Sequence, residues 1–362
     1  MTEQGQGSAC CGSQIGPQVP QSHEPWMIGE INTAGGTVAV AATRLTVRDR
    51  LGSFGARWGV NRMNYTVGPG LYAVGSPDET MPVFVTANYK MSFDHLRRSL
   101  DGMNAWILVL DTFGINVWCA AGKGTFGTEE LVRRIQLTGL AEVVSHRSII
   151  VPQLGAPGVA AHLVKARTGF RVVYGPVRAA DIPAYMANKM KASPEMRRVH
   201  FGVLDRLVLV PIELTASLKP ILIIGIALVL LRLAGVQGIT WGAVLTYLGA
   251  FLAGAAVTPI LLPWIPGRPF ALKGWLVGLG WAIMALYLRG LLPDGNVFET
   301  LPALLIVPAI SAYLAMNFTG ASTYTSPSGV KKEMRYALPV IGASGAAGLI
   351  LIVVWIVASG GM

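Results

Sequence analysis

The pattern of apolar and polar positions changes near residue 206. Before it, short β-type runs stand at PVFVTANYK (82–90), NAWILVLD (104–111), EVVSHRSIIVPQLGAPG (142–158) and GFRVVYGPVRAADIPAYM (169–186). The segments between them, SFDHLRRSL, TEELVRRIQLTG and VAAHLVKAR, are typical of amphipathic helices. Strands that alternate with helices predict a parallel sheet with helices on its faces, in an α/β domain over residues 31–205.

The stretch ahead of this domain, residues 1–30, is rich in Gly, Gln, Ser and Pro. This composition predicts a disordered N-terminal tail. The same stretch lacks the basic and apolar regions of a signal peptide. We therefore expect the soluble domain to stay in the cytoplasm. In that compartment the three cysteines, Cys10, Cys11 and Cys119, remain reduced.

Five long apolar stretches follow, each close to the roughly 20 residues that cross a bilayer. They predict an all-α membrane domain over residues 206–362 with transmembrane helices near 212–234, 239–262, 272–291, 299–317 and 337–358. The composition agrees, since 52% of the residues are hydrophobic, 13% are charged and the mean hydropathy is +0.51. Basic residues favour the cytoplasmic side of a membrane. Their distribution over the loops predicts a multi-pass protein of the cytoplasmic (inner) membrane with its C-terminus outside.

The formal net charge is +10, which would suit nucleic acid, anionic lipid or an acidic partner protein. Five basic residues precede the first apolar stretch, where such residues contact lipid headgroups: Lys189, Lys191, Arg197, Arg198 and Arg206. The sequence contains no aromatic RNA-binding motif and no zinc finger. Membrane lipid is therefore the predicted partner of this charge, and nucleic acid is not.

The candidate chemistry lies in NVWCAAGKGTFG (116–127). Gly122, Gly124 and Gly127 match G-x-G-x-x-G, but they follow the strand by about ten residues, whereas a dinucleotide site needs them directly after it. Two interpretations of Cys119 remain, a small buried hydrophobe and a thiolate metal ligand. For the second, VWCAAGK can form a short helix that the glycines end. Lys123 would then share a face with Cys119 and favour its thiolate form.

The eight residues NVWCAAGK resemble the motif of the corrinoid protein of bacterial and archaeal mercury methylation, the HgcA family. This family is related to the large subunit of the corrinoid iron-sulfur protein of the acetyl-CoA pathway. Its layout, a small Rossmann-like corrinoid domain followed by five transmembrane helices, is similar to the one predicted here. Residues 317–335 also resemble a segment shared with those proteins. The resemblance implies a bound cobalamin or related corrinoid, base-off, with the Cys119 thiolate as the catalytic group and lower axial ligand of cobalt.

The same resemblance implies a corrinoid-dependent methyltransferase that transfers a methyl group to Hg(II) and yields methylmercury. A thiolate opposite the methyl group donates electron density to cobalt and supports release of the methyl group to an electrophile. Three cysteines are too few to hold a cubane cluster. A ferredoxin-like partner with two 4Fe-4S clusters is therefore implied as the electron donor, together with a methyl-folate-type methyl donor.

The residues predicted to contact the cofactor form two groups. The first surrounds Cys119, where Asn116 and Trp118 would position the helix and Ala120 and Ala121 would leave room for the corrin ring; the group is Asn116, Val117, Trp118, Ala120, Ala121, Gly122, Lys123, Gly124, Thr125, Phe126 and Gly127. The second lies in loops that should enclose the cofactor tail at the carboxyl edge of the sheet: Thr66, Pro152, Gln153, Gly155, Ala156, Tyr174 and Gly175.

Three questions of function stay open at this stage. The vicinal thiols of Cys10 and Cys11 are a candidate site for capture of Hg(II), a soft metal that prefers sulfur. A membrane-anchored corrinoid methyl carrier that serves a different acceptor would share every cofactor prediction. A membrane transport subunit with a regulatory Rossmann-like domain is a third possibility, although the apolar stretches lack a chain of ionisable residues that would mark an ion path.

Overall fold

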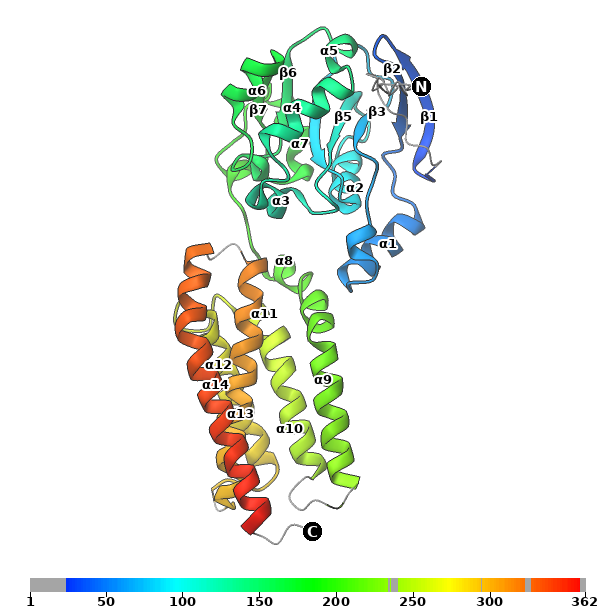
Figure 1. Ribbon diagram of the computed structural model, residues 1–362. Helices are drawn as coiled ribbons and strands as arrows, with labels where there is room; N and C mark the ends of the chain where they lie inside the picture. The colour runs from blue at the N-terminus through cyan, green and yellow to red at the C-terminus, as the bar shows by residue number, and fades with distance from the viewer. Residues whose placement is uncertain (1–23, 234, 236–239, 294, 323–326, 359–362) are drawn as a thin grey trace, which may run out of the picture. The chain divides into compact units, whose positions relative to one another are not determined.

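The computed structural model describes residues 24–233, 235, 240–293, 295–322 and 327–358 (Figure 1). The chain divides into two compact units. The first comprises the residues up to 56 and residues 61–198, and the second comprises residues 57–60 and the chain from residue 199 onward. The main division therefore falls at residue 199, a few residues before the boundary that the apolar pattern indicates.

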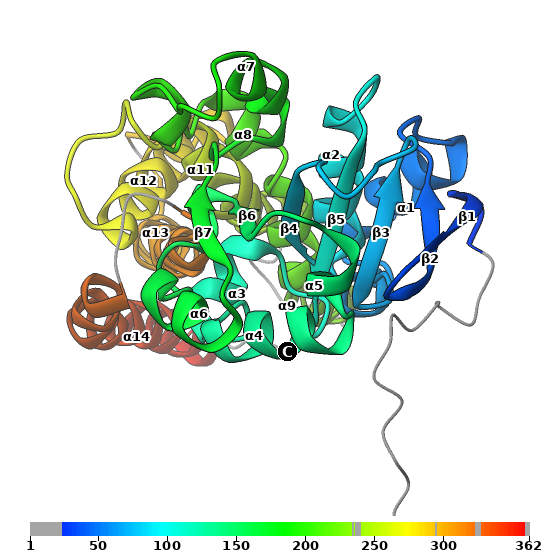
Figure 2. The same ribbon diagram turned by 90° about the horizontal axis from the view of Figure 1, so that it is seen from above.

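A seven-stranded sheet of order β1-β2-β3-β5-β4-β6-β7 lies at the centre of the first unit (Figure 2). Its strands are β1 (Met27–Thr33), β2 (Gly36–Ala41), β3 (Gly70–Val74), β4 (Val83–Ala87), β5 (Ala105–Leu110), β6 (Ser148–Val151) and β7 (Arg171–Tyr174). The neighbours β5, β4, β6 and β7 run parallel. These are the four strands that the sequence predicts.

The sheet as a whole is mixed, so the prediction of a parallel sheet is wrong for its other half. β3 pairs antiparallel with β5, and the hairpin of β1 and β2 extends the sheet beyond β3. Trp26, just ahead of β1, is 1% exposed and packs on the rings of Tyr72 and Phe93. Residues 24–30 therefore belong to the folded unit and not to a disordered tail. Residues 1–23, including Cys10 and Cys11, lie outside the described residues.

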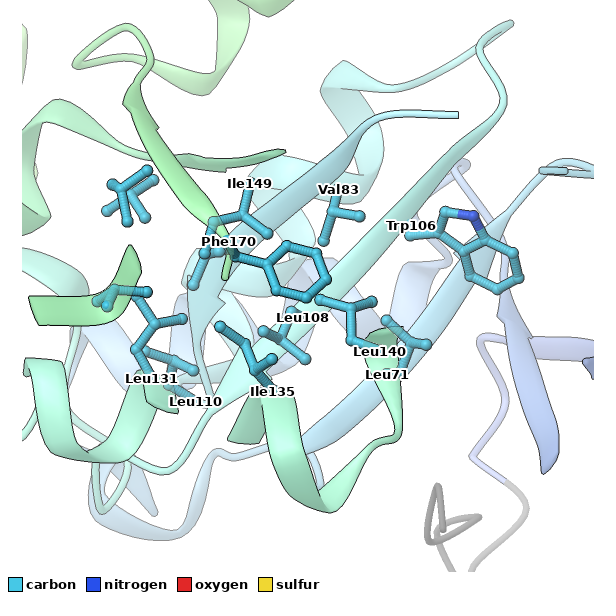
Figure 3. Packing of buried hydrophobic residues seen from close by; sticks show 14 of the residues in the cluster. Leu71, Val83, Trp106, Leu108, Leu110, Leu131, Ile135, Leu140, Ile149 and Phe170 are labelled. Carbon is cyan, nitrogen blue, oxygen red and sulfur yellow. The ribbon is translucent and has the colours of Figure 1, made fainter. Parts of the chain in front are cut away.

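Helices cover both faces of this sheet. On one face Leu131, Ile135 and Leu140, from α4 (Thr128–Leu137) and α5 (Leu140–Val143), pack against strand residues such as Leu71 and Leu108 (Figure 3). On the other face, α2 (Lys90–Ser99) and α7 (Ile182–Ala187) contribute Phe93, Leu96, Ile182 and Tyr185. Each apolar side chain buried in this way stabilises the fold by about 1.5–3 kcal/mol. The remaining helices of the unit are α1 (Val47–Arg57), η1 (Arg62–Asn64), α3 (Val117–Lys123), η2 (Gln153–Gly155), α6 (Ala161–Thr168), η3 (Ala179–Asp181) and η4 (Glu195–Arg197).

Four buried charges tie α1 to α2. Lys90 Nζ lies 2.7 Å from Asp49 Oδ1 and 2.8 Å from Asp94 Oδ1, while Arg97 bonds Asp49 and Asp94 at 2.9 and 2.7 Å. Burial alone would raise the pKa of Asp49, but hydrogen bonds from Lys90 and Thr46 outweigh it and hold that pKa well below its usual value. The two carboxylates and two cations compensate one another, which is what permits their burial.

The second unit is helical. Its elements are α8 (Val203–Leu207), α9 (Val210–Leu233), α10 (Trp241–Leu252), the π-helical turn η5 (Ala253–Val257), α11 (Thr258–Leu261), α12 (Phe270–Leu288), α13 (Val297–Asn317), η6 (Phe318–Ala321) and α14 (Pro327–Ala358). Among the described residues, four helical segments are long and apolar enough to cross a membrane: Trp241–Leu261, Phe270–Leu288, Val297–Asn317 and Ser328–Ala358. A fifth span results if the bent pair Val203–Lys219 and Ile221–Leu233 counts as one. This agrees with the predicted membrane domain of about five helices.

The basic residues ahead of the first span do not all face solvent. Lys189, Lys191, Arg197 and Arg198 are exposed, whereas Arg206 is 2% exposed. Its guanidinium carbon lies 5.4 Å from the ring centroid of Trp264, and Nη1 donates to the carbonyl of Phe201. Arg206 is therefore a packing residue of the helical unit, and the prediction that it contacts lipid headgroups is wrong.

Candidate functional site

Cys119 lies in α3, a seven-residue helix that is capped at both ends. Asn116 is the N-cap, and its Oδ1 accepts a hydrogen bond from the backbone N–H of Cys119 at 3.0 Å. At the other end, Gly124 adopts φ +82°, which favours glycine, and its N–H donates to the carbonyl of Ala121. The helix predicted for VWCAAGK is thus confirmed, and Asn116 positions its first turn.

The two sides of α3 differ in burial. Val117, Ala120 and Ala121 are at most 8% exposed and join the core beneath the helix. The other side is open: Trp118, Gly122, Lys123 and Gly124 are exposed and the free thiol of Cys119 is half-buried. A Cβ placed on Gly122 would meet no heavy atom within 4 Å. The helix therefore presents sulfur beside an uncovered glycine.

Several of the residues predicted to contact the cofactor are buried. Ala120 and Ala121 face the core, whereas Gly122 is exposed and a Cβ on it would meet nothing within 4 Å. Phe126 is fully buried, and its ring occupies the space that a Cβ on Gly155 would fill. Gly127 approaches the carbonyl oxygen of Gly124 so closely that a Cβ would lie 2.6 Å from it. These small residues serve the packing of α3, while Thr125 is half-buried.

The loop that leads from β5 into α3 is held by Asn88, which directly follows β4. Asn88 is 5% exposed, and its Oδ1 accepts hydrogen bonds from the N–H of Thr112 at 3.1 Å, the hydroxyl of Thr112 at 2.8 Å and the N–H of Gly114 at 3.1 Å. Its Nδ2 donates to Asp111 Oδ1 at 3.2 Å, and the N–H of Asp111 donates to Glu130 Oε1 at 2.9 Å. The side chains of Asn88, just after β4, and of Glu130 in α4 thus fix the loop that leads to Cys119.

The residues predicted at the ends of β6 and β7 lie in packed turns, except for Tyr174, which is the last residue of β7. η2, which follows Pro152, packs against α3. Gln153 Oε1 accepts from Arg197 Nη1 at 2.9 Å, and the Tyr174 hydroxyl donates to the carbonyl of Val159 at 2.7 Å. Burial raises the pKa of Tyr174. Pro152 and Ala156 are half-buried, and Gly175 is buried against Ile150.

A cavity of about 330 Å³ opens beyond the carboxyl ends of β4 and β5. Thr66, one of the predicted tail contacts, lines it together with Glu24, Trp26, Met27, Val67, Gly68, Pro69, Asn88 and Asp111. Among the described residues, the buried indole N–H of Trp26 has no hydrogen-bond partner. The sequence prediction missed Trp26, Asn88 and Asp111, although the position of the last two directly after strands was a usable signal. At about 330 Å³ the cavity is too small to enclose a corrin macrocycle.

This arrangement can hold a metal centre through sulfur. In the described part of the chain, no three His, Cys, Asp or Glu side chains come together in a way that could hold a metal ion. Cys119 offers one soft ligand on the open side of α3, and thiolates favour soft metals and cofactor metal centres over hard ones. A single protein ligand suits a metal whose other ligands come from a cofactor ring.

Comparison with known proteins covers this part of the chain. Residues 61–186 match the family described as the CO dehydrogenase/acetyl-CoA synthase delta subunit. The acetyl-CoA decarbonylase/synthase complex subunit gamma of Methanocaldococcus jannaschii is 33% identical over 129 residues, which are 35% of this chain and 26% of that protein. The subunit of the same name from Methanopyrus kandleri is 31% identical over 122 residues, 33% of this chain and 26% of that protein.

The chain spans about a quarter of the length of these relatives. The matched segment contains β3 to β7 and α3, whereas the hairpin of β1 and β2 and the helices from α8 onward lie outside it. Over residues 61–186 the α/β unit is therefore similar to a subunit of the CO dehydrogenase/acetyl-CoA synthase family, which supports the acetyl-CoA-pathway side of the resemblance drawn from the sequence.

Proposed function

We propose that this chain is a corrinoid-dependent methyltransferase in which Cys119 is the lower axial ligand of cobalt. The observation that carries the proposal is the placement of the Cys119 thiol on the open side of a helix fixed at both ends. Gly122, one turn further on the same side, leaves the space that a flat ring needs. The residues present therefore fit a corrinoid bound through sulfur.

A corrinoid supplies a cobalt centre that can carry a methyl group. In this account Asn116 fixes the first turn of α3, so the sulfur of Cys119 stays in one place. Trp118, the preceding residue, is 37% exposed and would offer apolar surface to the cofactor. Cys119 would hold the metal of this cofactor through sulfur, and a thiolate ligand there would raise the electron density on the metal and favour transfer of a methyl group to an electrophile.

We further propose that the methyl acceptor is Hg(II). This step rests on the resemblance of NVWCAAGK to the mercury-methylating family. Hg(II) is an electrophile, so the methyl group must reach it with its bonding electrons or as a radical. An electron-rich sulfur ligand supports both routes better than a neutral imidazole or water does.

The reaction needs partners that the chain does not contain. Three cysteines cannot hold a cubane cluster, so electrons would come from a ferredoxin-like protein with two 4Fe-4S clusters, and methyl groups from a methyl-folate-type donor. The α/β unit would lie in the cytoplasm and the C-terminus outside, because the basic loops are then on the inner side of the membrane.

A second candidate is a membrane-anchored corrinoid methyl carrier for a different acceptor. The matches to subunits of the acetyl-CoA decarbonylase/synthase complex favour it. It assigns the same role to Cys119 and differs only in what receives the methyl group.

The deciding experiment expresses the full chain with a ferredoxin-like partner in cells that do not methylate mercury, adds Hg(II) and measures methylmercury. Formation of methylmercury that depends on Cys119 supports the mercury proposal. Bound corrinoid with methyl transfer to another acceptor, and none to Hg(II), would support the carrier instead. A purified chain that takes up no corrinoid on reconstitution would refute both.

A further inference from the structure

A second, larger hollow lies in the helical unit, between the beginnings of α12 and α14. Its volume is about 930 Å³. Leu272 and Trp275 of α12 and Tyr336 and Val340 of α14 form its walls and are exposed. Arg268, just ahead of α12, and Lys332, in α14, also line it. We call this hollow the α12–α14 groove.

The groove exists because its floor is made of small side chains. Ala271 of α12, Ala312 of α13 and Ala337 of α14 pack together there, and α13 lies against both of the other helices (Figure 1). Glu333 Oε1 accepts a hydrogen bond from the N–H of Ala271 at 2.7 Å, which fastens α14 to the first turn of α12. That N–H is one of the orphan donors at the start of a helix whose N-cap, Pro269, has no side-chain acceptor. The groove is thus a fixed feature of three packed helices.

The length of α14 places the groove at the depth of lipid headgroups. The helix has 32 residues, or about 48 Å at 1.5 Å per residue, whereas the hydrocarbon core of a bilayer is about 30 Å thick. Its apolar part, near 337–358, is long enough to cross that core. The ten residues from 327 to 336 therefore extend into the interfacial layer, where Trp and Tyr side chains such as Trp275 and Tyr336 are enriched.

The charge at this end of the groove is net positive. Arg268 and Lys332 are exposed, and neither has an ion-pair partner among the described residues. The lining has one carboxylate, Glu333, which accepts a hydrogen bond from the N–H of Ala271, so two cations stand against one negative charge. The two cations thus share the groove lining with the apolar side chains of Leu272, Trp275 and Val340. An anionic phospholipid is complementary to this arrangement, because its phosphate is negative and its acyl chains are apolar.

We propose that the α12–α14 groove binds one anionic phospholipid, with its phosphate between Arg268 and Lys332 and an acyl chain along Leu272, Trp275 and Val340. Arginine and lysine both bind phosphate, arginine as a planar fork and lysine as a point charge. The site is separate from Cys119 and does not depend on the corrinoid proposal. The proposal assigns a binding role to residues 327–336, the part of α14 that precedes its apolar segment.

The test uses the full chain, purified in a mild detergent, stripped of lipid and mixed with phosphatidylglycerol or phosphatidylcholine. Native mass spectrometry then counts the lipids that remain bound. A variant with Arg268→Gln and Lys332→Gln is compared with a matched control that carries Lys331→Gln and Arg335→Gln. The control removes two charges from the same region but from residues outside the groove lining.

We expect the wild-type chain and the control to retain one phosphatidylglycerol, and the groove variant to retain it at least tenfold less. Thermal melting and circular dichroism of each variant establish that it is folded. Equal loss in both variants would overturn the proposal, as would equal retention of phosphatidylcholine. Binding of glycerol phosphate as tight as that of the lipid would show a free-phosphate site, and a dimer mass without lipid would show an interface between two copies; either result also overturns it.

Discussion

Asn116 accepts a hydrogen bond from the backbone N–H of Cys119 at 3.0 Å, so the N-cap of α3 directly holds the backbone of the candidate metal ligand. Replacing an N-cap residue by Ala costs about 1 kcal/mol, and α3 has only seven residues over which to absorb that loss. We expect Asn116→Ala to lower corrinoid occupancy about fivefold and to speed hydrogen exchange across residues 117–123. Asn116→Asp keeps the acceptor and should behave like the wild type. Equal exchange in the Ala variant and the wild type would contradict this role.

Asn88, which directly follows β4, holds the loop between β5 and α3 through its side-chain hydrogen bonds. In Asn88→Ala the N–H groups of Thr112 and Gly114 lose their acceptor in a buried position, at a cost of about 1–3 kcal/mol. We expect faster hydrogen exchange at residues 111–115 and weaker corrinoid binding, with the sheet intact. Thr80→Ala, which removes the hydrogen bond from the Thr80 hydroxyl to Asp78 in an exposed turn, is the control. If both variants bind corrinoid like the wild type, Asn88 does not position the site.

Gly122 tests the open side of α3 without weakening the helix. Leucine has a helix propensity about 1 kcal/mol better than glycine, so Gly122→Leu should not destabilise the fold. Its side chain would fill the space in which a Cβ now meets nothing within 4 Å. We expect at least a tenfold loss of corrinoid binding, a smaller loss for Gly122→Ala, and none for Arg133→Leu at an exposed position of α4. Full binding by the leucine variant would show that the cofactor does not approach this side.

The buried charges of α1 and α2 make stability depend on pH in the acid range. The pKa of Asp49 is lower in the folded chain than the unfolded value of about 3.9, so its contribution is fully present above about pH 4 and is lost as the pH falls further. Asp49→Asn removes one partner from a buried network, which costs about 3–5 kcal/mol.

Melting of the full chain between pH 3 and pH 7 measures this effect. We expect the melting temperature of the wild type to fall below pH 4, and that of Asp49→Asn to start lower and to change less over the same range. Glu30→Gln, at an exposed carboxylate of β1, serves as the control. A melting temperature for Asp49→Asn equal to that of the wild type at neutral pH would contradict the role given to the network.

The local parts of the fold could be predicted from the sequence, and the long-range parts could not. The four parallel strands, the helices between them and the long apolar helices each show their own periodicity. β3 and the hairpin of β1 and β2 do not alternate with helices along the chain. Their places in the sheet depend on pairing between strands, such as that of Tyr72 in β3 with Ile107 in β5. The sequence places Trp26 in the tail because the stretch before it is polar. The rings of Tyr72 and Phe93, on which it packs, are distant in the sequence.

The candidate site shows the same division. The motif located α3 and its caps, but it grouped core residues such as Ala120 and Phe126 with open ones. The spacing of Val117, Ala120 and Ala121, which is that of one helical face, was the signal that separates them. Asn88 could not be recognised as a support, because it acts on Thr112 and Gly114 through side-chain geometry that the sequence does not show.

The central claim is that Cys119 would hold the cobalt of a bound corrinoid through its sulfur. The most direct measurement is the absorption spectrum of the full chain reconstituted with cobalamin, for the wild type, Cys119→Ala and Cys119→His, together with the rate of methyl transfer to Hg(II). We expect each variant to change the spectrum, and Cys119→Ala to lower the rate by more than tenfold. An alanine variant that binds cobalamin with the wild-type spectrum and forms methylmercury at the wild-type rate would contradict the account.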